Sequence, residues 1–348
     1  GYGRSMKERL LIIGGVAAGM SAAARARRTN RDLEIVAYEK SGTISYGACG
    51  FPYFIKGDIP RIENLIARTP AQIAEQNIAA HVQHEVLAID PRAQTVRVLN
   101  RQTGREFTDH WDKLIIAAGA SVAPPPIPGS QLPGVFTLRT TEDALAIRRW
   151  LEVEKPRKGV IVGAGYIGVE MAEALRAHDV EVTVVDMAGQ VMPTLDADMA
   201  AHVLAELQTN NVTVSLQQPV RSFIGPAQVT NIVHKVAAKV QRQAENLTAE
   251  ASGRLRVREV VTDDQVFPAD IVIFGIGSRP NIALAQDAGI TIGSSGAIAV
   301  DDQQRTNLTN IWAAGAVAEA HHLVIKEAAY VPLATTASKQ GLSLIHIS

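Results

Sequence analysis

The sequence predicts an α/β protein in which one unit of strand, glycine turn, helix and strand occurs twice. The first observation is the repeat itself: GGVAAG at residues 14–19 and GAGYIG at residues 163–168 each follow an apolar run, LLII or VIV. The second is that each copy ends in another apolar run, which is closed by an acidic residue, Glu39 or Asp186. Unbroken apolar runs are typical of strands that are buried on both faces of a parallel sheet.

Length and composition fit two such domains and exclude several classes of function. The chain has 348 residues, a net charge of −1 and 5% aromatic residues, which excludes a chain-wide basic surface for nucleic acid and disfavours base stacking. One cysteine excludes an internal disulfide. No apolar stretch reaches the roughly 18 residues that a membrane span needs. We expect a cytoplasmic protein with no nucleic-acid partner, no membrane partner and no metal site.

The acidic residue that closes each copy lies at the distance expected of a dinucleotide site. Glu39 follows Gly19 by 20 residues, and Asp186 follows Gly168 by 18 residues. In such sites the glycines allow a tight turn, the pyrophosphate lies at the N-terminus of the following helix, and the carboxylate binds ribose hydroxyls. Two copies with this spacing predict two dinucleotide sites rather than two chance glycine-rich turns.

The two copies differ at the middle glycine, and Asp186 bears on cofactor choice. The second copy meets the G-x-G-x-x-G pattern with Gly163, Gly165 and Gly168, whereas the first carries Val16 at the middle position. Asp186 would repel the 2′-phosphate of NADPH, and none of the next four residues is an arginine that could bind it. The second site is therefore expected to prefer NADH to NADPH.

Cys49, the one cysteine, lies in the segment SYGACGFPY at residues 45–53, ten residues after Glu39. This places it just beyond the second strand of the first copy, beside the first dinucleotide site. Pro52 suits the first turn of a helix, so we expect Cys49 near a helix N-terminus, where the helix dipole favours the reactive thiolate. The alternative is a small buried thiol with no chemical role.

Further apolar runs and a proline-rich segment suggest the domain organisation. The runs at residues 113–119, 270–281 and 310–315 are typical of buried strands that end in small residues. The segment at residues 124–129 is typical of an extended crossing between domains. The expected parts are a discontinuous first domain at residues 6–122 and 281–341, a second domain at residues 123–280, and a non-native tail at residues 342–348.

Residues 220–258 are expected to form a surface hairpin insertion on the second domain. Their alternative is an amphipathic helix, because Ile232, Val233, Val236 and Val240 recur at helical spacing.

These motifs, in this order, resemble those of the flavin-dependent pyridine-nucleotide disulfide oxidoreductases. Within that family the chain is similar to the single-cysteine branch, which includes coenzyme A disulfide reductases and the related NADH oxidases and peroxidases. The resemblance covers residues 9–341. The matching segments are GGVAAG at 14–19, SYGACGFPY around Cys49, HEVLAID at 84–90, AAGA at 117–120, VGAGYIGVE at 162–170 and GIGSRPN at 275–281.

The resemblance implies a glutathione-reductase-like fold with FAD in the first domain, NADH in the second, and electron transfer from the flavin to Cys49. It implies that Glu39 binds the adenosine ribose and that Tyr166, with Glu170 nearby, covers the flavin on its nicotinamide side. The residues expected at FAD are Gly14, Gly15, Val16, Ala17, Ala18, Gly19, Glu39, Lys40, Ser45, Val86, Ala118, Gly119, Gly315 and Ala316. The residues expected at NADH are Gly163, Gly165, Tyr166, Ile167, Gly168, Glu170, Asp186 and Gly277.

Two features favour a coenzyme A disulfide reductase, or a reductase of a related low-molecular-weight disulfide or persulfide. Oxidases and peroxidases of this branch carry a histidine in the first glycine turn, where this chain has Ala17, and the string CGFPY is closer to the reductases. Relatives hold coenzyme A at positions that match Ser21, Arg25, Arg28 and Ser45, and arginine suits its phosphates. Ordinary solvated helix charge is the alternative for these arginines.

Two readings other than a disulfide reductase stay open. The first is an NADH oxidase or peroxidase that uses a sulfenic acid on Cys49. The second is a catalytically impaired fragment that binds FAD and NAD.

The impaired-fragment reading rests on two departures from the family. Relatives follow Gly315 with an aspartate that binds the ribityl chain of FAD, and this chain has Ala316. Loss of one hydrogen bond to a charged group costs roughly 1.5–3 kcal/mol, or about ten- to a hundredfold in affinity. Relatives also have a C-terminal dimerisation domain, which is expected to be missing here. The native full-length form is expected to be a homodimer.

Overall fold

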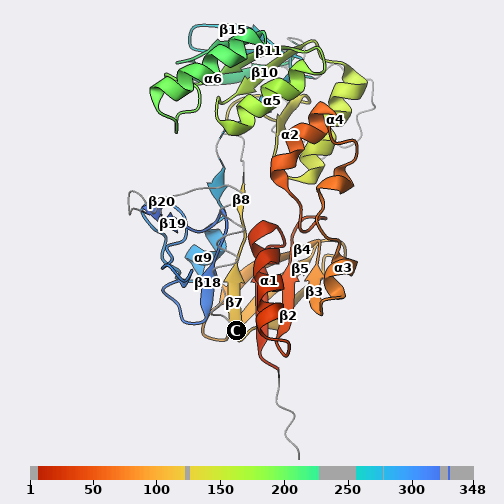
Figure 1. Ribbon diagram of the computed structural model, residues 1–348, viewed down its shortest axis with the longest axis vertical. Coiled ribbons are helices and arrows are strands. Elements are labelled where there is room, and N and C mark those ends of the chain that lie inside the picture. Colours follow the sequence, from red (N-terminus) through yellow and green to blue (C-terminus); the bar gives the residue numbers. More distant parts are fainter. Residues whose placement is uncertain (1–6, 122–125, 227–255, 277, 322–327, 330–348) are drawn as a thin grey trace, which may run out of the picture. The chain divides into compact units, whose positions relative to one another are not determined.

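The computed structural model describes residues 7–121, 126–226, 256–276, 278–321 and 328–329. The chain divides into two compact units (Figure 1). The first unit contains Gly1–Cys49, Glu63–Ser121 and Ser278–Ser348, and the second contains Gly50–Ile62 and Val122–Gly277. Each unit has its own five-stranded parallel sheet, so the expected α/β architecture is confirmed.

The sheet of the first unit has the strand order β18-β7-β1-β2-β3. Its strands are β1 (Arg9–Ile13), β2 (Glu34–Tyr38), β3 (Ile78–His81), β7 (Lys113–Ile116) and β18 (Ile311–Ala313). The register places Ile13 beside Tyr38 on one side and beside Ile116 on the other. The carboxyl ends of these strands therefore meet at one edge, which is where parallel α/β sheets bind ligands.

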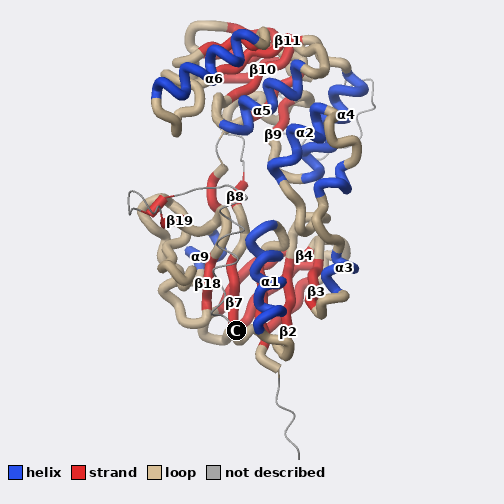
Figure 2. Tube along the Cα trace, in the orientation of Figure 1, coloured by secondary structure: helices blue, strands red, loops and turns tan. Residues whose placement is uncertain are grey.

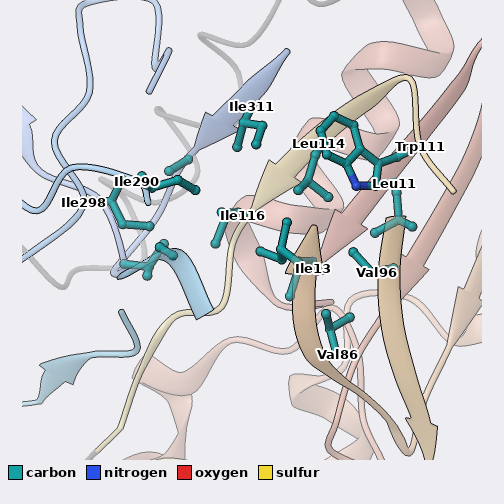
Figure 3. Close-up of a cluster of buried hydrophobic side chains, with 14 of the residues drawn as sticks. Leu11, Ile13, Val86, Val96, Trp111, Leu114, Ile116, Ile290, Ile298 and Ile311 are labelled. Atoms are coloured by element: carbon teal, nitrogen blue, oxygen red, sulfur yellow. The ribbon is translucent and has the colours of Figure 1, made fainter. Parts of the chain in front are cut away.

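Successive residues of β1 enter two different cores, because side chains alternate between the faces of a sheet. Leu10 and Ile12 pack with the helix α1 (Ala17–Thr29). Leu11 and Ile13 lie in the second core, together with Val86 from an antiparallel sheet (Figure 3). The strands of that sheet are β4 (His84–Asp90), β5 (Thr95–Asn100) and β6 (Glu106–His110).

Shorter elements complete the first unit. They are the helices α3 (Pro70–Ala74) and α9 (Ala283–Asp287), and the strand pairs β8 (Ala120–Ser121) with β17 (Arg279–Pro280) and β19 (Ala320–His321) with β20 (Ala328–Ala329). Two 3-10 turns, η1 (Ala48–Gly50) and η2 (Ile62–Leu65), lie where the chain passes from one unit to the other. Among the described residues, no helix has both the length and the apolarity of a membrane span.

The second unit repeats the arrangement, with the strand order β12-β11-β10-β16-β9. Figure 2 shows its strands in red and its helices in blue. Its sheet contains β9 (Val135–Thr137), β10 (Lys158–Val162), β11 (Glu181–Val185), β12 (Val212–Ser215) and β16 (Ile271–Phe274). Its helices are α2 (Phe51–Lys56), α4 (Thr141–Glu154), α5 (Tyr166–Arg176) and α6 (Ala197–Thr209). A small antiparallel sheet is formed by β13 (Val220–Ile224), β14 (Glu259–Thr262) and β15 (Val266–Pro268).

The two strands that flank the expected insertion, β13 and β14, pair with each other in antiparallel fashion. Residues 227–255, which include the four apolar residues at helical spacing, lie outside the described part of the chain, as do residues 122–125 and the tail.

The glycine turns of the two units match in detail, which confirms the internal repeat. The Gly14 N–H donates to the Tyr38 carbonyl at 2.8 Å, and the Gly163 N–H donates to the Val185 carbonyl at 2.8 Å. A Cβ at Gly19 would lie 1.9 Å from the Gly14 oxygen. A Cβ at Gly168 would lie 2.0 Å from the Gly163 oxygen. Glycine at the last position thus lets each helix pack directly on the turn before it.

The middle position of the turn does not require glycine for its backbone. Val16 has φ −97° and ψ −161°, and Gly165 has φ −81° and ψ −170°, so both are extended N-cap residues. A Cβ at Gly165 would meet only the Gly275 oxygen, at 4.0 Å. Val16 therefore leaves the fold of the first turn intact, although the sequence pattern is weaker there.

The close packing at Gly19 predicts that Gly19→Ala lowers the stability of the first unit by roughly 1–3 kcal/mol, because a methyl group would collide with the Gly14 carbonyl. Gly47→Ala is the control, because a Cβ there meets nothing within 4 Å. Urea unfolding monitored by circular dichroism measures both. Equal midpoints for the two variants would show that the turn has room for a side chain.

Candidate functional site

The first glycine turn is closed by the carboxylate of Glu39. Its Oε2 accepts a hydrogen bond from the Gly15 N–H at 2.7 Å, and its Oε1 accepts one from the Ser41 N–H at 2.9 Å. The residue is 7% exposed. A carboxylate has about four acceptor positions, so Glu39 is fixed in place and still has acceptor capacity for the hydroxyls of a ribose.

Asp186 has the same arrangement in the second unit. Its Oδ2 accepts a hydrogen bond from the Ala164 N–H at 2.6 Å, and its Oδ1 accepts one from the Ala188 N–H at 2.8 Å. In both units one donor is the residue after the first glycine, and the other lies two positions after the acid. The two carboxylates predicted from the sequence are therefore structurally equivalent.

A cavity of about 520 Å³ lies beside Glu39, within the first unit. We call it the carboxylate cavity. It brings together five of the predicted residues, namely Gly14, Glu39, Lys40, Val86 and Ala118. Tyr38, His84 and Asn281 also line it, although they were not predicted.

Asn281 is the most informative of these additions. Its Nδ2 donates to the Ala118 carbonyl at 2.8 Å, and its Oδ1 accepts from the Ser121 hydroxyl at 2.7 Å. The side chain therefore ties the segment after β7 to the segment that enters α9. The motif GIGSRPN ends at this residue, so the sequence held a signal for it, but no role followed from the motif alone.

Tyr38, in the wall of the carboxylate cavity, borders two ionisable groups, His81 and Asp109. The Tyr38 hydroxyl donates to Asp109 at 2.7 Å. The pKa of Tyr38 is raised mainly by burial and secondly by this hydrogen bond. The ring of His81 lies 5.4 Å from that of Tyr38. The pKa of His81 is lowered mainly by burial and secondly by the neighbouring His84. Burial acts to raise the pKa of Asp109, but the hydrogen bonds from Tyr38 and Arg9 outweigh it and lower that pKa.

A second cavity, of about 400 Å³, lies against α1 in the first unit. We call it the α1 cavity. It brings together the predicted substrate residues Ser21, Arg28 and Ser45, whereas Arg25 is not among the residues that line it. Arg68, which was not predicted, lines the cavity and donates to Gln76 at 3.1 Å. Two guanidinium groups from different segments give this cavity the cationic character that phosphates bind.

No sequence signal marked Arg68 as part of this site. The residue lies 40 positions after Arg28, just before the Thr69 cap of α3, and only the folded chain brings the two arginines to one cavity.

Cys49 is exposed and lies in η1, directly before α2. Pro52 occupies the first turn of α2, as expected. A buried thiol, the alternative from the sequence, does not fit this exposure, whereas the catalytic role of Cys49 stays a prediction.

The predicted nicotinamide-side residues lie at the start of α5. Tyr166 is 54% exposed, which suits a side chain that covers a ring. The pKa of Glu170 is raised mainly by burial and secondly by the negative charge of the neighbouring Glu173. Ile167 and Gly168 continue the same helical turn, and Gly277 lies outside the described residues.

The remaining predicted FAD residues lie at three places in the first unit. Val16, Ala17, Ala18 and Gly19 form the end of the glycine turn and the start of α1, Gly119 follows β7, and Gly315 and Ala316 follow β18. Within the described ranges, no group of three or more His, Cys, Asp or Glu residues is placed to hold a metal ion.

Glu319, the first acidic residue after Ala316, is held by contacts within the protein. Glu319 is 4% exposed, and its Oε1 accepts hydrogen bonds from the N–H and the hydroxyl of Ser295, at 3.2 and 2.7 Å. Its carboxylate is thus engaged within the protein.

Comparison with known proteins agrees with this geometry. Residues 8–341 match the pyridine nucleotide-disulphide oxidoreductase family. The chain is 36% identical to the NAD(P)H coenzyme A polysulfide/persulfide reductase of Pyrococcus horikoshii and 35% identical to the NADH oxidase of Methanocaldococcus jannaschii. It is 30% identical to the coenzyme A disulfide reductase of Staphylococcus haemolyticus. These matches cover 96–97% of this chain and 68–69% of the relatives.

A solved structure gives the same result. The NAD-dependent persulfide reductase from A. fulgidus is similar, with a TM-score of 0.85 and 34% identity; the match covers 97% of this chain and 58% of that one. The chain therefore spans little more than half of that protein. The family uses FAD and NAD(P)H. The resemblance seen in the motifs is thus confirmed: this chain belongs to the pyridine nucleotide-disulphide oxidoreductase family.

Proposed function

We propose that the chain is an FAD-dependent NAD(P)H oxidoreductase that reduces coenzyme A disulfide, or a related low-molecular-weight disulfide or persulfide, through Cys49. The observation that carries the proposal is the combination of two glycine–carboxylate sites with one exposed cysteine. The names of the relatives, which include a coenzyme A disulfide reductase and a coenzyme A persulfide reductase, support this substrate class.

The residues of the first unit fit the adenosine end of FAD. The carboxylate cavity is within the usual size range of ligand pockets. Glu39 retains acceptor capacity for ribose hydroxyls, and the rings of Tyr38 and His84 in the cavity wall suit a planar base. We assign FAD to the domain of residues 6–122 and 281–341 on this basis.

The residues of the second unit fit NADH. The space beside Gly165 is open, since a Cβ there would meet one atom at 4.0 Å, and this allows a pyrophosphate to approach the turn. Asp186 stands where a ribose would bind and disfavours a 2′-phosphate. We assign NADH to the domain of residues 123–280, with NADH preferred over NADPH.

In this function Cys49 supplies the reacting sulfur. Its thiolate attacks one sulfur of the substrate disulfide, the substrate S–S bond breaks, and one thiol leaves while the other stays in a mixed disulfide with Cys49. Two electrons from NADH then break the mixed disulfide and restore the Cys49 thiolate. One NADH and one proton thus convert one disulfide into two thiols. FAD, when bound, supplies hydride acceptance from NADH and two-electron transfer to sulfur.

The α1 cavity would hold the nucleotide part of the substrate. Arg28 and Arg68 provide bidentate donors for phosphate, and Ser21 and Ser45 add hydroxyl groups. We also propose that the full-length protein is a homodimer and resides in the cytoplasm, where the single cysteine would remain reduced.

One observation favours a second function, NADH oxidase or peroxidase activity with a sulfenic acid on Cys49. The relative from Methanocaldococcus jannaschii is named an NADH oxidase. Ala17 disfavours it, because the histidine that would stand beside the cysteine is missing. Rapid NADH consumption with peroxide and no added thiol would support this second function over the first.

Cys49→Ser is expected to abolish reduction of coenzyme A disulfide by NADH, because serine forms no mixed disulfide. Reduction of bound flavin by NADH should continue, since it precedes the sulfur step. Anaerobic absorbance measurements follow the flavin, and a thiol assay follows the disulfide. Full disulfide reductase activity in Cys49→Ser would exclude the proposed mechanism.

The double substitution Asp186→Ala with Met187→Arg is expected to shift the preference toward NADPH by roughly tenfold or more, because it removes a repulsive charge and adds a phosphate donor. The ratio of kcat/KM for NADPH to that for NADH measures the shift. Met199→Arg is the control, since it adds an arginine to another exposed methionine of the second unit. An unchanged ratio in the double variant would show that Asp186 does not bind the ribose of the cofactor.

Arg28→Met is expected to raise the KM for coenzyme A disulfide roughly tenfold, through loss of a phosphate contact. The KM for pantethine, which lacks the nucleotide, should stay within about threefold of the wild-type value. Arg31→Met is the control, because Arg31 is exposed and does not line the α1 cavity. Equal effects on both substrates would contradict phosphate binding at Arg28.

A further inference from the structure

We propose that Arg148 is a positioning residue for Cys49, and that it acts by holding the short helix α2, which begins two residues after the cysteine. Arg148 acts together with Glu173 and His178, and we call these three residues the α2 clamp. The inference rests on the proposed role of Cys49 as the reacting sulfur.

Arg148 binds the end of α2 and the loop that follows it. Its Nη1 lies 3.1 Å from the Phe54 carbonyl oxygen, 3.2 Å from the Ile59 oxygen and 3.2 Å from the Pro60 oxygen. Its guanidinium carbon lies 4.6 Å from the centre of the Phe54 ring, within the range of a cation–π contact. Its Nε donates to Glu152, one turn later in α4, at 3.0 Å, which fixes the direction of the guanidinium group.

The other two clamp residues bind the same end of α2. His178 Nε2 donates to the Ile55 carbonyl at 2.7 Å, and Lys56 Nζ lies 2.8 Å from Glu173 Oε1. Glu173 lies in α5, and His178 lies in the turn after it. The last carbonyls of a helix have no donors within the helix, so side chains from α4 and from the α5 region supply them here.

A helix as short as α2 depends on such contacts. It has six residues, and isolated helices shorter than about 12 residues are marginal in water. Phe54 and Ile55 are fully buried, which orients the helix, and the clamp prevents its last turn from fraying.

The consequence for Cys49 follows from the continuity of the chain. Cys49 is exposed in η1, and Gly50 is both the last residue of η1 and the N-cap of α2. The backbone on the C-terminal side of the thiol is therefore held only as firmly as α2 itself. A loss of about 1 Å in the placement of a reacting atom can cost up to about a hundredfold in rate.

The test compares Arg148→Met with Arg149→Met in the FAD-loaded full chain. Arg149 is the next residue of α4, is exposed, and takes no part in the hydrogen bonds to α2 and its loop described above. In Arg148→Met, amide hydrogen exchange at residues 51–60 should become roughly ten- to a hundredfold faster. The kcat for coenzyme A disulfide should fall roughly tenfold or more, while reduction of bound flavin by NADH keeps its rate. Arg149→Met should behave as wild type.

Arg148→Lys and His178→Ala keep the test decisive if Arg148→Met does not fold. Each variant should show faster exchange at residues 51–60 and a lower kcat for coenzyme A disulfide, with an unchanged rate of flavin reduction. Exchange and kcat equal to those of Arg149→Met would overturn the proposal, and so would an equal loss in both the flavin and the disulfide steps.

Failure of the proposed function would be recognised separately. A wild-type chain that reduces no disulfide would contradict the function. Exchange at residues 51–60 and the rate of Cys49 alkylation by iodoacetamide would still decide the role of Arg148. Cys49 is the single cysteine of the chain, so the alkylation signal is unambiguous. A rate of Cys49 alkylation that is the same in Arg148→Met and Arg149→Met would overturn the positioning role.

Discussion

The hydrogen bond between a strand-end carboxylate and the N–H of a glycine turn organises both halves of this molecule. Glu39 binds the turn after β1, and Asp186 binds the turn after β10, with donors at the same relative positions. Each bond closes the gap between two neighbouring parallel strands at their carboxyl ends. It also places a carboxylate oxygen beside the glycine turn that leads into the following helix, the position at which dinucleotide folds in general bind ribose.

Residues that act through local geometry could be predicted from the sequence. The glycines before α1 and α5 were recognisable because a side chain at Gly19 or Gly168 would collide with the preceding backbone. The helix after Cys49 was recognisable from Pro52. Val16 looked like a defect in the pattern, but its backbone is extended, as at Gly165, so the pattern demanded more than the fold does.

Residues that act through tertiary contacts could not be predicted in this way. Arg68 joins Arg28 in the α1 cavity from a distant segment, and Arg148 reaches α2 across more than eighty positions of sequence. Neither residue lies in a motif, and both would pass as solvated surface charge. The exposure of Cys49 likewise depends on the packing around η1, which a single chain segment does not determine.

The chain matches its family over residues 8–341 and carries Ala316, a residue without a carboxylate, directly after Gly315. Glu319, the next acid along the chain, accepts hydrogen bonds from Ser295. The proposed FAD site therefore relies on the Glu39 carboxylate, and position 316 contributes no carboxylate to it.

Visible absorbance of the purified chain, recorded anaerobically during titration first with FAD and then with NADH, tests the central claim most directly. Two intact nucleotide sites predict that about one FAD binds per chain and that its absorbance near 450 nm bleaches when NADH is added. A protein that remains colourless after incubation with FAD, or a bound flavin that NADH does not bleach, would contradict the claim.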